Sequence, residues 1–464
     1  MAVLGWLLVA SWFAVTVVSK IAFYRAGVSV NDIFLFANAF ANTHFPDKLL
    51  YTATYDYWRG IHSLLWDHNV LTSVLLIPFY NLFDGALCFI VLQALAPAGL
   101  VLGLVIVARR LGGDSLPGLA VALLTLFNPT FTNSVLDPVG GFRLDVQFLL
   151  YFPAFITCFL LRRPVATMVF LLLFLGIKEN AAFYGMAFGA LVATLGIPLG
   201  SYRRLGLAVA LLSAVYLVLA VVFIPRWAGV PNVYVHWGVS HVGRGMLAGA
   251  ADGFFRQKWY EFYLYFIYAI GSLPFYLATL PDVGMYSLLE RSSSIYYDFT
   301  CIVMLSFGTL AALLRLHASG ESGFAGLTRR LFKVAIAAQL AIAIPWTGWQ
   351  FIHDWHKSMV AAVHVPAADK EAAWNMVDLN CGVCPHDAIL DRFYKLPYWL
   401  RTDLPQVARY LVTIDPASLS AVALERDPLT PFLAANRDRL RLVGRAGPLT
   451  VWLNPSVPCL PWGK

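Results

Sequence analysis

The sequence predicts an α-helical polytopic membrane protein with a small C-terminal α/β domain, and three observations support this fold class. Of the 464 residues, 59% are hydrophobic and 13% are charged, whereas soluble domains are about 45–50% apolar and about 25% charged. Long apolar runs recur through the first 349 residues. Charge then becomes denser, with 23 charged residues in the last 115 against 36 in the first 349. This composition excludes soluble, disordered and disulfide-scaffold proteins.

The apolar runs predict about eleven membrane spans, since a helix needs about 20 apolar residues to cross a bilayer core. The first run, Ala2 to Val18, is uncharged and lacks the basic start and cleavage site of a secretory signal, which favours an uncleaved anchor. Further runs occupy 86–108, 115–130, 145–161, 164–177, 180–197, 205–224, 299–316 and 331–348. The stretch 258–290 is broken at Gly271–Pro274 and predicts a hairpin of two short helices.

Paired arginines in short loops predict the orientation, because such loops stay in the cytoplasm. The pairs are Arg109-Arg110, Arg162-Arg163, Arg203-Arg204 and Arg329-Arg330. The N-terminus is then cytoplasmic, and long outer loops cover 19–85, 131–144 and 225–257. Lys20 and Arg25 oppose this orientation, and the apolar stretch 70–83 must be juxtamembrane or re-entrant for the alternation to hold. The net charge of +7 indicates orientation and lipid contact rather than nucleic-acid binding.

The transmembrane domain therefore covers residues 1–349, and residues 350–464 form an extracytoplasmic α/β domain. Helices are expected at 368–379 and 429–440, a strand at 409–414 and a closing hairpin at 441–453.

The cysteines of this domain favour a structural disulfide over metal or haem chemistry. Cys381 and Cys384 are the candidate pair, and Cys459 is either a further pairing partner or free. Pro385 breaks the CxxCH spacing of a haem site, and one cysteine pair with His386 falls short of a zinc set.

Carboxylates and histidines near apolar spans are the first candidates for chemistry. Asp32 follows the first span by about a dozen residues, where it could act as a general base or bind a divalent cation, Mg²⁺ or Mn²⁺. The alternative is a solvated loop with an interfacial aromatic belt. Asp67 and His68 open the stretch 70–83 as an acid/base or phosphate-binding pair, unless Asp67 merely caps a helix.

Basic groups in the other outer loops could bind an anionic head group. Lys178 and Glu179 interrupt an apolar run where the topology requires an outer turn, with Lys178 holding a phosphate and Glu179 orienting it. A simple polar hairpin turn is the alternative. Arg143 ends the second outer loop, while Arg291 and Tyr297 lie in the last short one. Together these loops predict one cavity at the outer leaflet.

Several short motifs resemble a family of bacterial predicted membrane proteins of unknown function that is related to the GT-C glycosyltransferases. The motifs are Asn31-Asp32, Asp67-His68 with Pro78-Phe79-Tyr80, Gln93, Lys178-Glu179, and the tail residues Pro385-His386, Arg392, Tyr394 and Pro397. The resemblance implies a GT-C-like fold in the bacterial cytoplasmic membrane, a catalytic Asp32 and a polyprenyl-phosphate sugar donor. Relatives tend to have Phe-His-Pro at Phe142–Leu144 and His-Tyr at Tyr296-Tyr297, so acid/base chemistry at these positions is in doubt.

Two functional hypotheses from different classes follow. The first is a glycosyltransferase that moves a sugar from a polyprenyl-phosphate donor to an acceptor at the outer face of the membrane. Arg143 and Lys178 would hold the donor phosphate, and Asp67 with His68 would line the acceptor side. The second is a non-catalytic membrane subunit that binds other subunits through its outer domain. A transporter is weaker, because few ionisable groups lie at mid-membrane depth and no inverted repeat is visible.

Overall fold

The structure is a computed structural model that describes most of the chain. The described residues are 2–28, 32–44, 49–54, 63–66, 70–83, 85–137, 140–197, 199, 202–228, 246–256, 258–288, 299–318, 323–360, 362–396, 398–402, 404–419 and 427–459.

Five helical segments of the described chain are long and apolar enough to cross a membrane, as the composition predicts. They are α1 (Ala2–Arg25), α5 with α6 (Ala86–Leu95 and Pro97–Gly112), α12 continued into α13 (Arg203–Val218 and Ile224–Ala228), α19 (Phe299–Ala318) and α20 (Gly323–Val360). A sixth candidate is the pair α7 (Leu116–Leu126) and α8 (Pro129–Leu136), bent by 67°.

Shorter apolar helices fill the space between these segments. They are α9 (Phe148–Leu160), α10 (Pro164–Leu175) and α11 (Ala181–Leu195). A helix of 12 residues such as α10 is about 18 Å long, less than the thickness of a bilayer core of about 30 Å. Length alone therefore does not make these helices spans, and the count of about eleven stays a prediction.

Two predicted hairpin or re-entrant stretches consist of short helical pieces. Residues 70–83 form η2 (Leu71–Leu76) and α4 (Ile77–Leu82). The stretch 258–290 contains α16 (Trp259–Tyr265), η5 (Ile267–Ser272), α17 (Leu273–Leu277) and α18 (Leu280–Leu288). The predicted break at Gly271–Pro274 is confirmed, because η5 ends and α17 begins there and Ser272 has φ −136° and ψ 75°. Further turns at Phe266 and at Ala278-Thr279 were not predicted.

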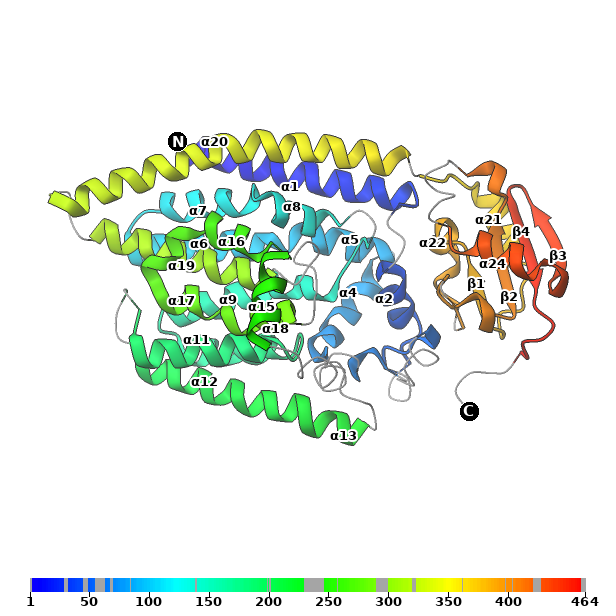
Figure 1. Ribbon diagram of the computed structural model, residues 1–464, viewed down its shortest axis with the longest axis horizontal. Helices are drawn as coiled ribbons and strands as arrows, with labels where there is room; N and C mark the ends of the chain where they lie inside the picture. Colours follow the sequence, from blue (N-terminus) through cyan, green and yellow to red (C-terminus); the bar gives the residue numbers. More distant parts are fainter. Residues whose placement is uncertain are drawn as a thin grey trace.

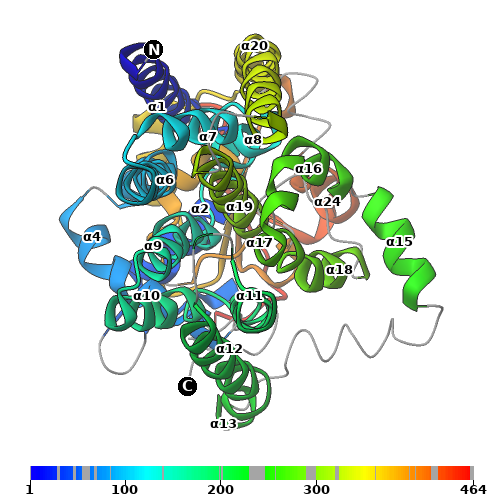
Figure 2. The same cartoon turned by 90° about the vertical axis from the view of Figure 1, so that its left-hand side faces the viewer.

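The apolar helices divide into buried and outward-facing ones (Figures 1 and 2). In α19, 83% of the spanning window is buried, whereas in α20 only 17% is. Both are apolar, so the exposed faces of α20, including Ile342 and Ile352, suit lipid. α1 and α20 run along one edge of the molecule (Figure 1) and meet near their C-terminal ends, where the rings of Phe23 and Trp355 lie 5.6 Å apart.

The C-terminal domain contains a four-stranded sheet in the order β1-β2-β4-β3. The strands are β1 (Val383–Pro385), β2 (Tyr410–Ile414), β3 (Arg441–Ala446) and β4 (Leu449–Leu453), with β1 and β2 parallel and the other pairs antiparallel. The predicted strand at 409–414 and the hairpin at 441–453 thus form. The hairpin turns at Gly447, whose φ of +54° favours glycine.

The helices of this domain are shorter than predicted. They are α21 (Ala367–Trp374), α22 (Leu390–Phe393) and α24 (Leu429–Asn436), and a 3₁₀ turn follows α24 at Arg437–Arg439. The long helix α20 also continues through the predicted boundary at residue 350, so the connection to the sheet begins only after Val360.

The predicted pairing of Cys381 with Cys384 is wrong, because Cys381 forms its disulfide with Cys459. Cys384 is a buried free thiol in the middle of β1, and its Sγ donates to the carbonyl of Arg401 at 3.2 Å. Residues three apart on an extended chain are about 10 Å apart, beyond the reach of a disulfide. The Cα atoms of Cys381 and Cys459 are 4.8 Å apart.

Candidate functional site

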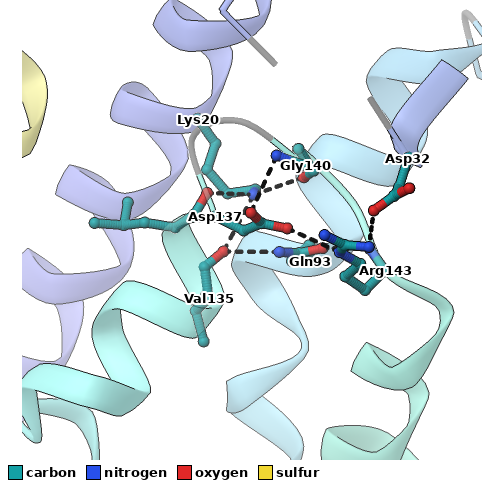
Figure 3. Close-up of polar contacts among 9 residues, drawn as sticks. Lys20, Asp32, Gln93, Val135, Asp137, Gly140 and Arg143 are labelled. Carbon is teal, nitrogen blue, oxygen red and sulfur yellow. Dashed lines mark hydrogen bonds and ion pairs between the residues drawn. The ribbon is translucent and has the colours of Figure 1, made fainter. Parts of the chain in front are cut away.

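Polar side chains from four separate elements meet at the segment that joins α8 to α9 (Figure 3). We call this cluster the polar junction, and its members are Lys20 of α1, Asp32 of α2 (Asp32–Ala41), Gln93 of α5, and Asp137 and Arg143 of the joining segment. Charged groups so close to apolar helices are costly unless they are paired. The contacts below show how each one is satisfied.

Asp32 and Arg143 form an ion pair between the first and the second predicted outer loops. Asp32 is the first residue of α2, where a carboxylate is favoured by the helix dipole. The next residue, Ile33, donates its N–H to the carbonyl of Gly140 at 3.0 Å. The side chains of Asp32 and Arg143 are 14% and 18% exposed, so both remain within reach of a ligand.

Arg143 also contacts a second carboxylate on its other side. Its Nε lies 3.2 Å from Oδ2 of Asp137, and Oδ1 of Asp137 accepts the N–H of Gly140 at 3.0 Å. Gln93 anchors the same segment, since its Oε1 accepts the N–H of Arg143 at 2.8 Å and its Nε2 donates to the carbonyl of Val135 at 3.0 Å. The guanidinium is therefore held between Asp32 and Asp137.

Lys20 is buried next to Asp137 and Arg143, with 1% of its surface exposed. Its Nζ donates to the carbonyls of Val135, Leu136 and Gly141 at 3.1, 2.8 and 2.7 Å. A cation at the C-terminal end of α8 is favoured by the helix dipole. The positive-inside rule concerns loops. Lys20 lies within a helix and therefore does not oppose the predicted orientation.

Lys178 and Glu179 lie in the turn between α10 and α11, and both side chains are buried rather than solvated. Nζ of Lys178 is 3.3 Å from Oδ1 of Asp145. Asn180 of the same turn donates to the hydroxyl of Tyr286 at 3.0 Å. Because Asp145 is two residues from Arg143, one short segment contacts both Asp32 and Lys178.

The α2 helix that carries Asp32 is fixed to the C-terminal domain. Nδ2 of the buried Asn38 donates to the carbonyls of Tyr394 and Leu396 at 2.6 and 2.8 Å. The ring of Phe34 packs on that of Tyr394 at 5.4 Å. The C-terminal domain thereby helps to hold this helix, and with it Asp32, in place.

The structure describes only some of the predicted site residues. Asp67, His68, Arg291 and Tyr297 lie outside the described residues. Asp32, Arg143, Lys178 and Glu179 are described, and the segment 143–145 links two of them through direct contacts. Sequence reasoning overlooked the roles of Lys20 and Asp137. A lysine that continues an apolar helical run was the available signal for Lys20.

The predicted divalent cation at Asp32 finds no complete ligand set among the described residues. Arg143 lies between Asp32 and Asp137 and supplies the positive charge there. The group of potential ligands found in the described part of the chain is Asp378, Cys381 and Cys459, and its cysteines are disulfide-bonded. Cation binding by Asp32 stays a prediction.

Comparison with known proteins identifies the fold. No protein-family model matches the sequence, and no curated protein matches it. The structure is similar to the crystal structure of ArnT from Cupriavidus metallidurans bound to undecaprenyl phosphate, with a TM-score of 0.54 and 14% sequence identity. The match covers 97% of this chain and 98% of that one. The chain is therefore a membrane protein with a GT-C-like fold and a small C-terminal sheet domain.

Proposed function

We propose that this protein is a membrane glycosyltransferase that moves a sugar from a polyprenyl-phosphate donor to an acceptor at the outer face of the membrane. The GT-C-like fold supports the proposal, as does the undecaprenyl phosphate bound by the similar ArnT structure. The observation that carries it is the Asp32–Arg143 pair, a partly exposed carboxylate and guanidinium that separate loops bring together.

The Asp32–Arg143 pair supplies the two groups that a sugar transfer needs, a base for the acceptor and a cation for the leaving phosphate. Asp32 would take the proton of the acceptor hydroxyl while the oxygen of that hydroxyl forms a bond to the anomeric carbon of the sugar. The bond from that carbon to the phosphate oxygen breaks, and the phosphate leaves with the electron pair. Arg143 would bind this phosphate, because a guanidinium matches a phosphate with parallel hydrogen bonds. A phosphate on Arg143 would also compete with Asp32 for the guanidinium and so release the carboxylate as a base.

Other predicted residues complete the proposed site. Lys178 would add a second positive charge from the turn behind Asp145, with Glu179 beside it. Asp67 and His68 are proposed to line the acceptor side, and Arg291 and Tyr297 are proposed to bind substrate. The contact of Lys178 with Asp145 supports a single site, since the segment 143–145 then carries partners of both Asp32 and Lys178.

Replacement of the proposed base tests the reaction. Asp32→Asn keeps the size of the side chain but removes its basicity, and we expect the yield of transferred sugar to fall by about 100-fold or more. The measurement is the glycolipid and glycan profile of cells that carry the variant as their only copy, with binding of undecaprenyl phosphate by the purified protein measured in parallel.

Asp438→Asn serves as the control, because Asp438 is an exposed carboxylate in the C-terminal domain. Asp32→Asn is expected to retain lipid binding while losing product. An unchanged profile in Asp32→Asn cells would reject the catalytic role of Asp32 and favour a non-catalytic membrane subunit.

A further inference from the structure

The strand β3 forms one edge of the four-stranded sheet in the C-terminal domain. It pairs with β4 on one side, and no other strand of the described chain lies on its opposite side. Backbone N–H and C=O groups that point away from β4 have no backbone partner among the described residues. Such an edge can accept a further strand, because its donors and acceptors are already spaced as in a β-ladder.

Positive charge is concentrated at this edge. Residues 437–445 contain four arginines and one carboxylate, a net charge of +3. The other residues of the domain, from 350 to 464, hold 8 basic and 10 acidic residues. We call the stretch 437–445 the basic edge, and its arginines are Arg437, Arg439, Arg441 and Arg445. The excess of positive charge therefore belongs to the basic edge and not to the domain as a whole.

The arginines of the basic edge are available to another molecule. All four are exposed, and none forms an ion pair or hydrogen bond through its side chain within the part of the chain that the structure describes. Elsewhere in the domain, Arg392 lies 2.8 Å from a carboxylate oxygen of Glu371. An unpaired guanidinium can bind a carboxylate of a partner through two parallel hydrogen bonds.

Apolar side chains lie between the charges of β3. Leu442 and Val443 are 46% and 42% exposed, although both are large hydrophobic residues. The register with β4 shifts between Leu442 and Gly444, which leaves Val443 without an opposite residue on β4. A strand added beside β3 would thus meet apolar side chains as well as arginines, and cross-strand pairs of both kinds stabilise a sheet.

The charges also determine which occupant fits the basic edge. Two copies of β3 placed side by side would bring arginines of both chains together, and like charges across a strand pair are destabilising. β3 lies on the side of the C-terminal domain that points away from the transmembrane helices (Figure 1). This position favours a partner outside the membrane over lipid head groups. A strand with carboxylates satisfies both the backbone groups and the arginines.

We propose that the basic edge binds an extended acidic segment of a partner protein, which adds to the sheet as a fifth strand beside β3. The carboxylates of this segment bind Arg441 and Arg445, and its apolar side chains contact Leu442 and Val443. The interaction does not depend on the proposed transferase activity.

Peptide binding to the full-length protein tests the proposal. The probe is a blocked octapeptide of alternating glutamate and valine, with fluorescence anisotropy as the measurement. A peptide with lysine for glutamate should bind at least about tenfold more weakly, because every attraction becomes a repulsion. A glutamate peptide with two valines replaced by proline keeps its charge but cannot extend a sheet, and it should also bind at least about tenfold more weakly. Equal binding of the glutamate and proline peptides would reduce the interaction to charge attraction and overturn strand addition.

Variants of the protein locate the binding surface. Arg445→Glu should weaken binding of the glutamate peptide about fivefold or more, since a repulsion replaces an attraction. Lys395→Glu, at an exposed lysine of the same domain outside the basic edge, is the matched control and should bind as the unmodified protein does. Arg441→Glu combined with Arg445→Glu should prefer the lysine peptide, a gain of binding that an unfolded domain cannot produce. No binding of the glutamate peptide to the unmodified protein, or equal binding by Arg445→Glu and Lys395→Glu, would overturn the proposal.

Discussion

At the scale of single residues, Lys20 joins α1 to the end of α8 through three backbone carbonyls. Polar groups in an apolar interior are satisfied by one another, and removal of one partner leaves the others without hydrogen bonds. Gln93 also donates to one of these carbonyls, that of Val135. Lys20 is thus a structural cation that supports the segment from which Asp137 and Arg143 extend.

Lys20→Met should therefore destabilise the protein by about 2 kcal/mol, since the carbonyls of Leu136 and Gly141 lose their buried donor. The measurement is the thermal unfolding midpoint of the purified protein. Lys258→Met, at a lysine whose side chain is 67% exposed, should leave that midpoint unchanged. A similar midpoint for Lys20→Met would show that the ammonium contributes nothing to stability.

The environment of His386 predicts that the stability of the C-terminal domain depends on pH. Burial lowers the pKa of His386 below its usual 6.5, and the nearby Asp427 opposes this only in part. The imidazole Nδ1 accepts the N–H of Ala388 at 3.1 Å, which requires that nitrogen to be unprotonated. The unfolded chain therefore takes up a proton before the folded one as the pH falls.

Little stability should be lost above pH 7.5, and up to about 1.4 kcal/mol should be lost in total by pH 5.5. Hydrogen exchange of the backbone amide at position 386, corrected for the intrinsic effect of pH, measures the change, because this N–H donates to the carbonyl of Val412 in β2. His386→Gln should remove this part of the pH dependence. The same loss of protection in His386→Gln would assign it to another group.

At the scale of elements, α11 and α12 pack closely because glycines face one another. A Cβ on Gly189 would lie 2.5 Å from both the amide nitrogen of Ala210 and the carbonyl oxygen of Gly206. These are backbone atoms and cannot move aside alone. Small residues bring helix backbones together in this way in membranes, where dispersion contacts drive association.

Gly189→Ala should force the two helices apart and destabilise the protein by about 1–3 kcal/mol. Gly348→Ala in α20 is the matched control, because nothing lies within 4 Å of a Cβ at that position. It should be neutral or slightly stabilising, since alanine is the better helix former. Equal unfolding midpoints for the two variants would contradict tight packing of α11 on α12.

At the scale of the whole molecule, the predicted orientation places the polar junction and the C-terminal domain on the outer side. Alkaline phosphatase fused after Gly113 should be inactive, because Arg109 and Arg110 hold that loop in the cytoplasm. Fused after Pro366, beyond the end of α20, it should be active. Activity at Gly113 would reverse the orientation and move the proposed site to the cytoplasmic face.

The sequence pointed to some residues of the candidate site but not to the residues that they contact. Asp32, Arg143 and Lys178 were identified as charged residues next to apolar runs, because the cost of burying a charge makes such residues conspicuous. Their partners could not be predicted. Asp32 lies far along the chain from its partner Arg143, and Lys178 lies 33 residues from Asp145, so only the packing of the helices brings each pair together.

The disulfide likewise shows that the sequence identified the residues but not their partners. Two cysteines three residues apart suggested a local bond, but Cys384 lies within β1, where backbone pairing with β2 directs its side chain into the core. Cys381 instead bonds to Cys459, 78 residues away. The spacing of cysteines along the chain does not show that these two side chains lie close together in space.

The sequence by itself determined that the chain is a helical membrane protein with a small sheet domain, because apolar runs and charge density follow directly from the solvent that each segment meets. The tertiary structure decided which charges meet, since ion pairs and strand pairing depend on distances between segments remote in sequence. Asp32 is held by Arg143, Lys20 supports the segment that carries Arg143, and β3 is an edge strand because β4 lies between it and β2.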